Sequence, residues 1–254
     1  MPALSAEGII LRKYFLRETS YILVVFTREF GKIRGVLKGA RNPYPQFAGN
    51  FELFTKCDLL FYKKKNMDLI TRCEASEFFL PVRKNIERLT YACYFIELID
   101  AVTHDYDVNV ELYHILLEGL RLLATEASPK RTARIFELKL MDAAGFGPQL
   151  EECARCSSSE GKDFWFSINA GGIVCRECIE EKDIYLKISR GTLNFLRRIR
   201  GMPFSKTARI KVSRDVGKET EASLKKFIQY YVGRQVKSMK FLEEIEKKRI
   251  LQKV

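Results

Sequence analysis

The sequence contains little histidine and lacks the short motifs of several common enzyme classes. Only His104 and His114 are present, and neither lies in the H-x-E setting of the zinc deaminases. The chain has no G-x-x-x-x-G-K-[ST] phosphate loop, no G-x-G-x-x-G turn, no G-x-S-x-G elbow and no H-E-x-x-H pair. We therefore predict a protein that is not an enzyme.

Long hydrophobic runs are also absent. No segment approaches the length of about 20 apolar residues that crosses a bilayer, and the first residues lack the basic and apolar regions of a secretion signal. With 254 residues and a hydrophobic content of 46%, the chain is long and apolar enough to bury a core. We expect a folded cytoplasmic protein without a membrane partner.

Cysteine is the most informative residue that is present. Two C-x-x-C pairs, separated by eighteen residues, are formed by Cys153, Cys156, Cys175 and Cys178. This spacing is typical of a tetrahedral four-thiolate zinc site, which leaves no open position for catalysis. The remaining three cysteines cannot all pair, which argues against a disulfide framework. We predict one structural zinc ion.

The charge balance points to polyanionic partners. The chain has 44 Lys and Arg against 32 Asp and Glu, a formal net charge of +12. Such a surplus attracts nucleic acid, although it also occurs in proteins that are merely soluble. The placement of the cations must decide between the two.

The first eighty residues have the pattern of a small β-barrel. Short runs of β-branched and aromatic residues, separated by turn signals, predict strands at 9–15, 21–27, 32–38, 51–62 and 67–78. Five strands in this length favour an OB-fold, which binds nucleic acids or other oligomers. Gly35 and Gly39 are candidate bulge or bend points where the barrel turns its corner.

After residue 83 the hydrophobic period becomes helical. Apolar residues at three- and four-residue spacing predict helices over 86–99, 112–123 and 135–141, and Tyr91, Tyr94 and Phe95 are expected in their core. Ser128 and Gly145 are expected to start and end the third helix. Further helices should follow Ser189 and run from about residue 219 to the end. The fold class is therefore α+β.

The cysteine pairs enclose two short strands around Asn169 to Gly172, a hairpin between two knuckles. The predicted organisation is an OB-fold nucleic-acid-binding domain at 1–80 and a helical domain at 81–254, with a zinc ribbon inserted at 150–182. Because the ribbon is too small for a core of its own, the metal should contribute to its folding.

Basic residues concentrate on the predicted barrel. By the two-residue period of a strand, Lys32, Arg34 and Lys38 share a face, and Arg41 follows in the next turn. Cations in such a row can follow a phosphate backbone and release its counterions. We predict a nucleic-acid-binding surface here.

Three segments resemble the bacterial recombination mediator family RecO. They are 21–41 (YILVVFTREFGKIRGVLKGAR), then 134–138 (RIFEL) with 145–147 (GFG), and 231–242 (YVGRQVKSMKFL). Their order, together with the four-cysteine ribbon, extends the resemblance over nearly the whole chain.

The resemblance implies a protein without turnover that binds single- and double-stranded DNA and anneals complementary strands. It implies action with RecR to load RecA on DNA coated by single-strand-binding protein. By position, the DNA contacts would be Lys32, Arg34, Lys38 and Arg41, with Arg12 and Lys13 as further candidates. Arg134, or Arg131 in its place, would meet the C-terminal tail of single-strand-binding protein. Some relatives lack the cysteines, so the metal is not part of a shared chemistry.

Two other functions stay open at this point. One is a zinc-containing adaptor whose basic surface binds an acidic protein, and the other is an RNA-binding factor without DNA annealing activity. A zinc hydrolase is disfavoured because all four ligand positions are cysteine.

Overall fold

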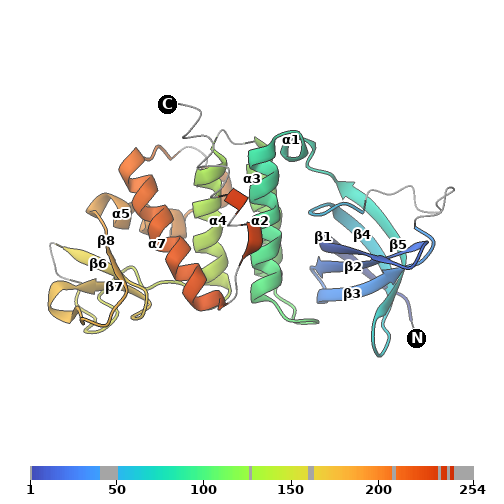
Figure 1. Ribbon diagram of the computed structural model, residues 1–254, viewed down its shortest axis with the longest axis horizontal. Coiled ribbons are helices and arrows are strands. Elements are labelled where there is room, and N and C mark those ends of the chain that lie inside the picture. Colours follow the sequence, from blue (N-terminus) through green and yellow to red (C-terminus); the bar gives the residue numbers. More distant parts are fainter. Residues whose placement is uncertain are drawn as a thin grey trace. The chain divides into compact units, whose positions relative to one another are not determined.

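A computed structural model describes residues 2–40, 51–125, 128–159, 163–207, 210–233, 236–238 and 241–242 (Figure 1). By their contacts, the described residues of 1–125 and 237–254 form one compact unit, and those of 126–236 form a second. We call them unit 1 and unit 2. The boundary near residue 80 that the sequence suggests stays a prediction.

Unit 1 begins with a closed five-stranded barrel. Its strands are β1 (Leu4–Leu16), β2 (Ser20–Thr27), β3 (Gly31–Leu37), β4 (Lys56–Tyr62) and β5 (Asp68–Glu77), in the order β1-β2-β3-β5-β4. All neighbours are antiparallel except β3 and β5. Alternate side chains fill the interior, among them Ile10, Val25, Ile33, Phe61 and Ile70. This is the predicted OB-fold, in which the first strand starts five residues earlier and the fourth strand five residues later than expected.

Two glycines in and after β3 have different roles. Gly39 adopts a left-handed φ of 70°, as a bend point requires. Gly35 lies in an uninterrupted register with β2, and a Cβ there would come within 2.5 Å of Ile70 Cγ1. Gly35 therefore lets the Ile70 side chain pack across β3, and it does not form a bulge.

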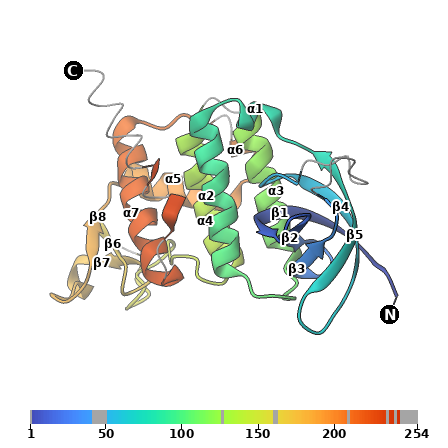
Figure 2. The same ribbon diagram turned by 45° about the vertical axis from the view of Figure 1, so that its right-hand side comes forward.

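The helices of unit 1 are α1 (Leu80–Arg83), α2 (Ile86–Val102) and α3 (Val110–Thr125). Asn85 caps α2 by accepting from Arg88 N. The consecutive residues Tyr94, Phe95 and Ile96 of α2 are all buried, so buried positions occur around most of the circumference of this helix. Figure 2 shows α2 beside α3. The expected core positions of the aromatic residues on α2 are confirmed.

Unit 1 also includes residues from the end of the chain. Glu97 of α2 accepts hydrogen bonds from the backbone N–H groups of Lys237 and Ser238, at 2.7 and 2.9 Å. The predicted last helical stretch from 243 onward lies outside the described residues.

Unit 2 combines helices with a small sheet. Its helices are α4 (Pro129–Ala143), α5 (Arg190–Gly201), α6 (Phe204–Thr207) and α7 (Arg214–Val232), and its strands are β6 (Phe164–Ser167), β7 (Gly172–Cys175) and β8 (Tyr185–Lys187). A short 3-10 helix, η1 (Arg176–Cys178), follows β7. The strands pair in the order β7-β6-β8. The hairpin of β6 and β7 was expected, whereas β8 was not.

The ends of the unit 2 helices follow local sequence signals. The Ser128 side chain accepts from Arg131 N at the start of α4, and Gly145 after its end has a φ of 80°. Ser189 and Ser213 cap α5 and α7 in the same way as Ser128 caps α4. No helix among the described residues is both long and apolar enough to pass through a bilayer.

Candidate metal centre and basic surfaces

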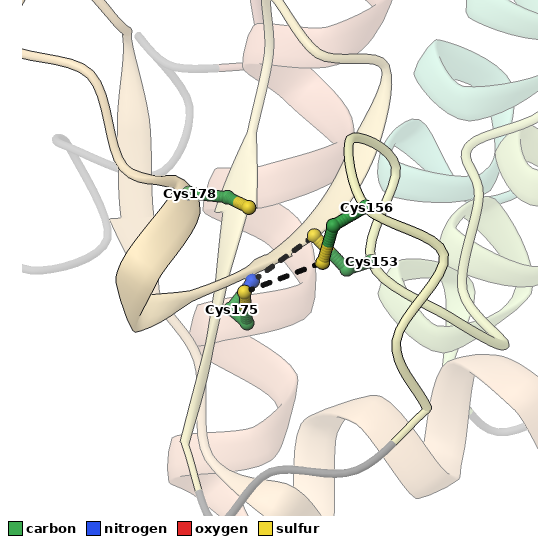
Figure 3. Close-up of side chains that lie close together, drawn as sticks. All are labelled: Cys153, Cys156, Cys175 and Cys178. Carbon is green, nitrogen blue, oxygen red and sulfur yellow. Dashed lines mark hydrogen bonds between the residues drawn. The ribbon is translucent and has the colours of Figure 1, made fainter.

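Four cysteine side chains of unit 2 meet at one point. Their sulfur atoms all lie within 4.8 Å of one another and come from the turn before β6 (Cys153 and Cys156), the end of β7 (Cys175) and the end of η1 (Cys178). Figure 3 shows the sulfur atoms turned toward one another. The predicted grouping of the four cysteines is therefore confirmed.

The spacing of the sulfur atoms suits a tetrahedral ion. The Sγ atoms of Cys156 and Cys175 are 3.8 Å apart, and a zinc ion with bonds of about 2.3 Å to four sulfurs would set them about 3.8 Å apart. Cys175 N also lies 3.4 Å from Cys153 Sγ, as a donor to a thiolate would. The donor set is compatible with a structural metal.

The thiols differ in acidity. Burial opposes ionisation of Cys153, but backbone N–H groups of Cys156, Cys175 and Arg155 lower its pKa to about 6. At Cys175, burial and the neighbouring Cys178 and Glu177 raise the pKa above its usual range. Four thiolates so close together repel one another, and a bound cation removes that repulsion.

Arg155, between the first two cysteines, links the two halves of the cluster. Its Nη1 donates to the Cys178 carbonyl at 2.9 Å, and its Nη2 donates to Asp183 at 2.9 Å. It also forms an ion pair with Glu180 at 2.5 Å. This role of Arg155 could not be predicted from the sequence, because its partners Glu180 and Asp183 lie more than twenty residues away.

Lys32, predicted to contact DNA, requires a correction. It lies on the expected side of β3, but it is only 4% exposed. Its ammonium donates to the Asp100 carboxylate and carbonyl, both at 3.0 Å, and to the Thr103 carbonyl at 2.7 Å. The last turn of α2 covers this end of the strand, so Lys32 is not an exposed cation.

Three further predicted barrel cations are exposed to different degrees and are ion-paired. Arg12 pairs with Asp100 at 2.5 Å, Lys13 with Glu52 at 2.7 Å and Arg34 with Asp105 at 3.2 Å. Burial of Asp100 acts to raise its pKa, but Lys32 and Arg12 outweigh burial and hold the pKa below its usual value. Lys38 is exposed, and Arg41 lies outside the described residues.

The predicted DNA contacts did not include a second group of barrel cations. Lys63, Lys64 and Lys65 are exposed in the turn between β4 and β5. Because β5 runs parallel to β3 with Asp68 opposite Gly35, this turn lies toward the Arg34 end of β3. The Lys63 ammonium sits 3.8 Å from the centre of the Tyr106 ring. The run of three lysines was the signal that could have identified it.

In unit 2, Arg134 is buried and pairs with Glu137 at 2.8 Å. Arg131 is half-buried, and its Nη1 donates to the Ile210 carbonyl at 3.0 Å. Ile210 lines a groove of about 220 Å³ whose floor is apolar, with Phe195 and Val216, and whose rim carries Arg198 and Lys211. Arg131 therefore lies beside a basic and apolar groove, whereas Arg134 does not present a free charge.

A closed barrel of OB topology, a helical region and a cluster of four cysteines compatible with a structural metal define the class, an OB-fold protein with a four-cysteine ribbon. The OB-fold is widely used to bind nucleic acids. The family models for the N-terminal and C-terminal parts of recombination protein O match residues 1–79 and 83–240. The chain belongs to the RecO family.

Individual relatives support this membership. The chain is 31% identical over 243 residues to the DNA repair protein RecO of Pelotomaculum thermopropionicum, covering 96% of this chain and 94% of the relative. It is 32% identical over 248 residues to that of Moorella thermoacetica, with 96% and 92% covered. The protein of Listeria monocytogenes is 29% identical over 241 residues, with 95% and 94% covered. The resemblance seen in the sequence is thus confirmed.

Proposed function

We propose that the protein acts in recombinational DNA repair by binding single- and double-stranded DNA on its barrel and annealing complementary strands. With RecR it would help to load RecA onto DNA coated by single-strand-binding protein. The proposed setting is the bacterial cytoplasm, at the nucleoid during repair. Family membership supports the repair role, and the barrel surface supports the binding of DNA.

The observation that carries the proposal is the set of exposed cations along β3 and in the turn between β4 and β5. Arg34 and Lys38 lie on and after β3, and three lysines follow in the turn between β4 and β5. In OB-folds the strands 2–3 face and the loop between strands 4 and 5 hold oligonucleotides. Arg12 and Lys13 on β1 stay secondary candidates because each is half-buried and paired with a carboxylate, whereas Arg34 is exposed despite its pair with Asp105. Arg41 stays a prediction.

Annealing requires no proton transfer or covalent step. Cations that neutralise phosphates reduce the repulsion between two strands, and contacts to the backbone leave the base edges available for pairing. Affinity should therefore fall steeply with salt and depend little on sequence.

We propose that the four thiolates hold one zinc ion. When bound, the ion supplies structural cross-linking of the ribbon and no open coordination position. Arg155 fixes the relative position of the two knuckles, and the apolar residues around Trp165 complete the module.

For the tail of single-strand-binding protein, the groove beside Arg131 is the better candidate. An acidic peptide that ends in an aromatic residue could place its ring on Phe195 and Val216 and its carboxylates near Arg198 and Lys211. Arg134 would act only indirectly, because its charge is already paired with Glu137.

The test compares two variants that lose the same number of charges. In the barrel variant, Lys38, Lys64 and Lys65 are replaced by Gln; in the control variant, the exposed Lys84, Lys182 and Lys206 are replaced by Gln. A labelled single-stranded oligonucleotide is titrated across a salt series. Because each phosphate contact contributes about 0.7 to the salt slope, the barrel variant should lose about 2 from the slope, and the control should lose little.

Equal binding by the two variants would place the DNA site elsewhere. Absence of binding by the unmodified protein would refute the proposal and favour the adaptor. Equal affinity for structured RNA and for DNA would favour an RNA-binding factor.

A further inference from the structure

The most basic stretch of the chain lies outside the barrel. Residues 184–236 contain thirteen Lys and Arg and only three Asp and Glu. The stretch includes α5 and α7 of unit 2. A surplus of this size within about fifty residues is the electrostatic pattern of a polyanion-binding surface, provided that the cations are exposed and unpaired.

Two of these cations form hydrogen bonds that stabilise the fold. Arg197 donates to the carbonyls of Leu150 and Glu151, at 2.7 and 2.8 Å. Arg200 binds the Asp142 carboxylate with two hydrogen bonds and also donates to the Pro148 carbonyl. Both therefore hold the segment that follows α4 and are not available for a ligand.

Three others form a row along α7. Arg214, Lys218 and Lys226 are exposed, and the exposed Ala222 and Tyr230 continue the same four-residue spacing. By the rise of a helix, neighbouring positions of this row are about 6 Å apart and the whole row is about 24 Å long. We call these five residues the α7 row.

The cations of the α7 row are not neutralised by their neighbours. Within the described parts of the chain, none of the three forms an ion pair. The carboxylate of Glu219, on the same helix, is turned to the start of α5, where it accepts from Ser189 N at 2.7 Å and Thr192 Oγ1 at 2.5 Å. Asp215 is exposed and Glu221 is half-buried in the first part of α7, and no carboxylate follows them in the helix.

Tyr230 presents a fixed aromatic ring at the end of the row. It is 51% exposed, and its ring stands edge-on to Tyr231 at 5.2 Å. Tyr231 is itself held 4.4 Å from the buried Phe227. An exposed ring with a rigid support is the arrangement on which a nucleic-acid base can stack.

We propose that the α7 row binds a single strand of nucleic acid, with phosphates along the cations and a base on Tyr230. This inference rests on the proposed function and adds a second strand site to it, on unit 2. A nucleic-acid strand fits the row better than an acidic peptide does. The three cations are spread over several helical turns, and the only residue of the row between Lys218 and Lys226 is the small Ala222. An aromatic peptide side chain needs a pocket, and that is offered by the groove beside Ile210.

The first test uses a third variant of matched charge. Replacing Arg214, Lys218 and Lys226 by Gln lowers the net charge by the same amount as the barrel and control variants do. In the salt series with a single-stranded oligonucleotide, this α7 variant should bind about tenfold more weakly at low salt and lose about 2 from the salt slope. The rate of annealing of two labelled complementary strands should fall in the α7 variant and in the barrel variant, and not in the control.

The second test determines whether a base contacts Tyr230. An oligonucleotide that contains 5-bromouracil is cross-linked by light, and the modified peptide is identified by mass spectrometry. The peptide that contains Tyr230 should carry the cross-link. Tyr230→Phe should keep the affinity of the unmodified protein, whereas Tyr230→Ala should weaken binding about fivefold because stacking is lost.

The outcomes separate this inference from the proposed function. If the barrel variant is impaired and the α7 variant behaves as the control does, the inference is wrong and the barrel function stands. If the unmodified protein binds no DNA, both are wrong. If an acidic peptide depends on the α7 row while DNA does not, the surface belongs to a protein partner and the inference is overturned.

Discussion

The barrel and the helix α7 differ in how far nearby carboxylates neutralise their positive charges. Residues 1–80 contain thirteen Lys and Arg, and among those that the structure describes at least six, including Lys32 and Arg34, form ion pairs with nearby carboxylates. On α7, the three cations of the row have no such partner among the described residues. A count of cations therefore does not locate a polyanion site. The pairing of those cations does, because a paired cation must first lose its partner.

The largest effect should come from changing the four cysteines, because their thiolates repel one another unless a cation binds between them. Replacing Cys175 by Ser, or removing metal with a chelator, should unfold the ribbon, because its sheet has little apolar core. Trp165 on β6 is the only tryptophan, so its fluorescence should shift to the red. The barrel should keep its circular dichroism signal. Cys93→Ser, on α2, should change neither signal.

The next effect concerns the most buried pair of the barrel. Asp100→Ala leaves the Lys32 ammonium buried with only two carbonyl partners. Breaking a buried pair in this way should lower the free energy of unfolding by about 3 kcal/mol, measured by urea denaturation. Asp105→Asn, which breaks the exposed pair with Arg34, should cost less than about 1 kcal/mol. Similar losses in the two variants would contradict the distinction between buried and exposed pairs.

Acid should weaken the same buried pair. Because the folded pKa of Asp100 lies below its unfolded value, its contribution to stability is complete above the unfolded pKa and is lost as pH falls through the folded pKa, thus below about pH 4. Between about pH 5 and 2, the Asp100→Asn variant should lose less free energy of unfolding than the unmodified protein does. Urea denaturation at each pH measures this difference. Burial acts to raise the pKa of Glu7, but hydrogen bonds from Lys56 and Tyr113 lower it below its usual value. Protonation of Glu7 should therefore account for part of the stability that the Asp100→Asn variant still loses in acid.

The smallest effect should come from releasing one exposed barrel cation. Asp105→Asn removes the partner of Arg34 and should raise the affinity for single-stranded DNA about twofold, consistent with the modest strength of surface pairs. Asp58→Asn makes the same change in net charge at an exposed position of β4. If both variants gain equally, net charge and not the release of Arg34 is responsible.

The sequence predicted what depends on local pattern. Alternating apolar residues indicated the barrel, C-x-x-C spacing indicated the cluster, and Ser128 and Gly145 marked the ends of α4. It could not show the burial of Lys32, because the covering residue Asp100 is 68 positions away in the chain. Nor could it show β8, because three residues are too few for a periodic signal. Exposure of the α7 row likewise became clear only once the packed side of α7 was known.

The last residues of the chain have a consequence for the order in which the protein is made. Residues 237–238 are bound by Glu97 and belong to unit 1, although the whole of unit 2 precedes them in the sequence. A ribosome therefore synthesises unit 2 before the final pieces of unit 1 exist. Unit 2 has all its residues first, and unit 1 is completed only after the whole of unit 2 has been synthesised.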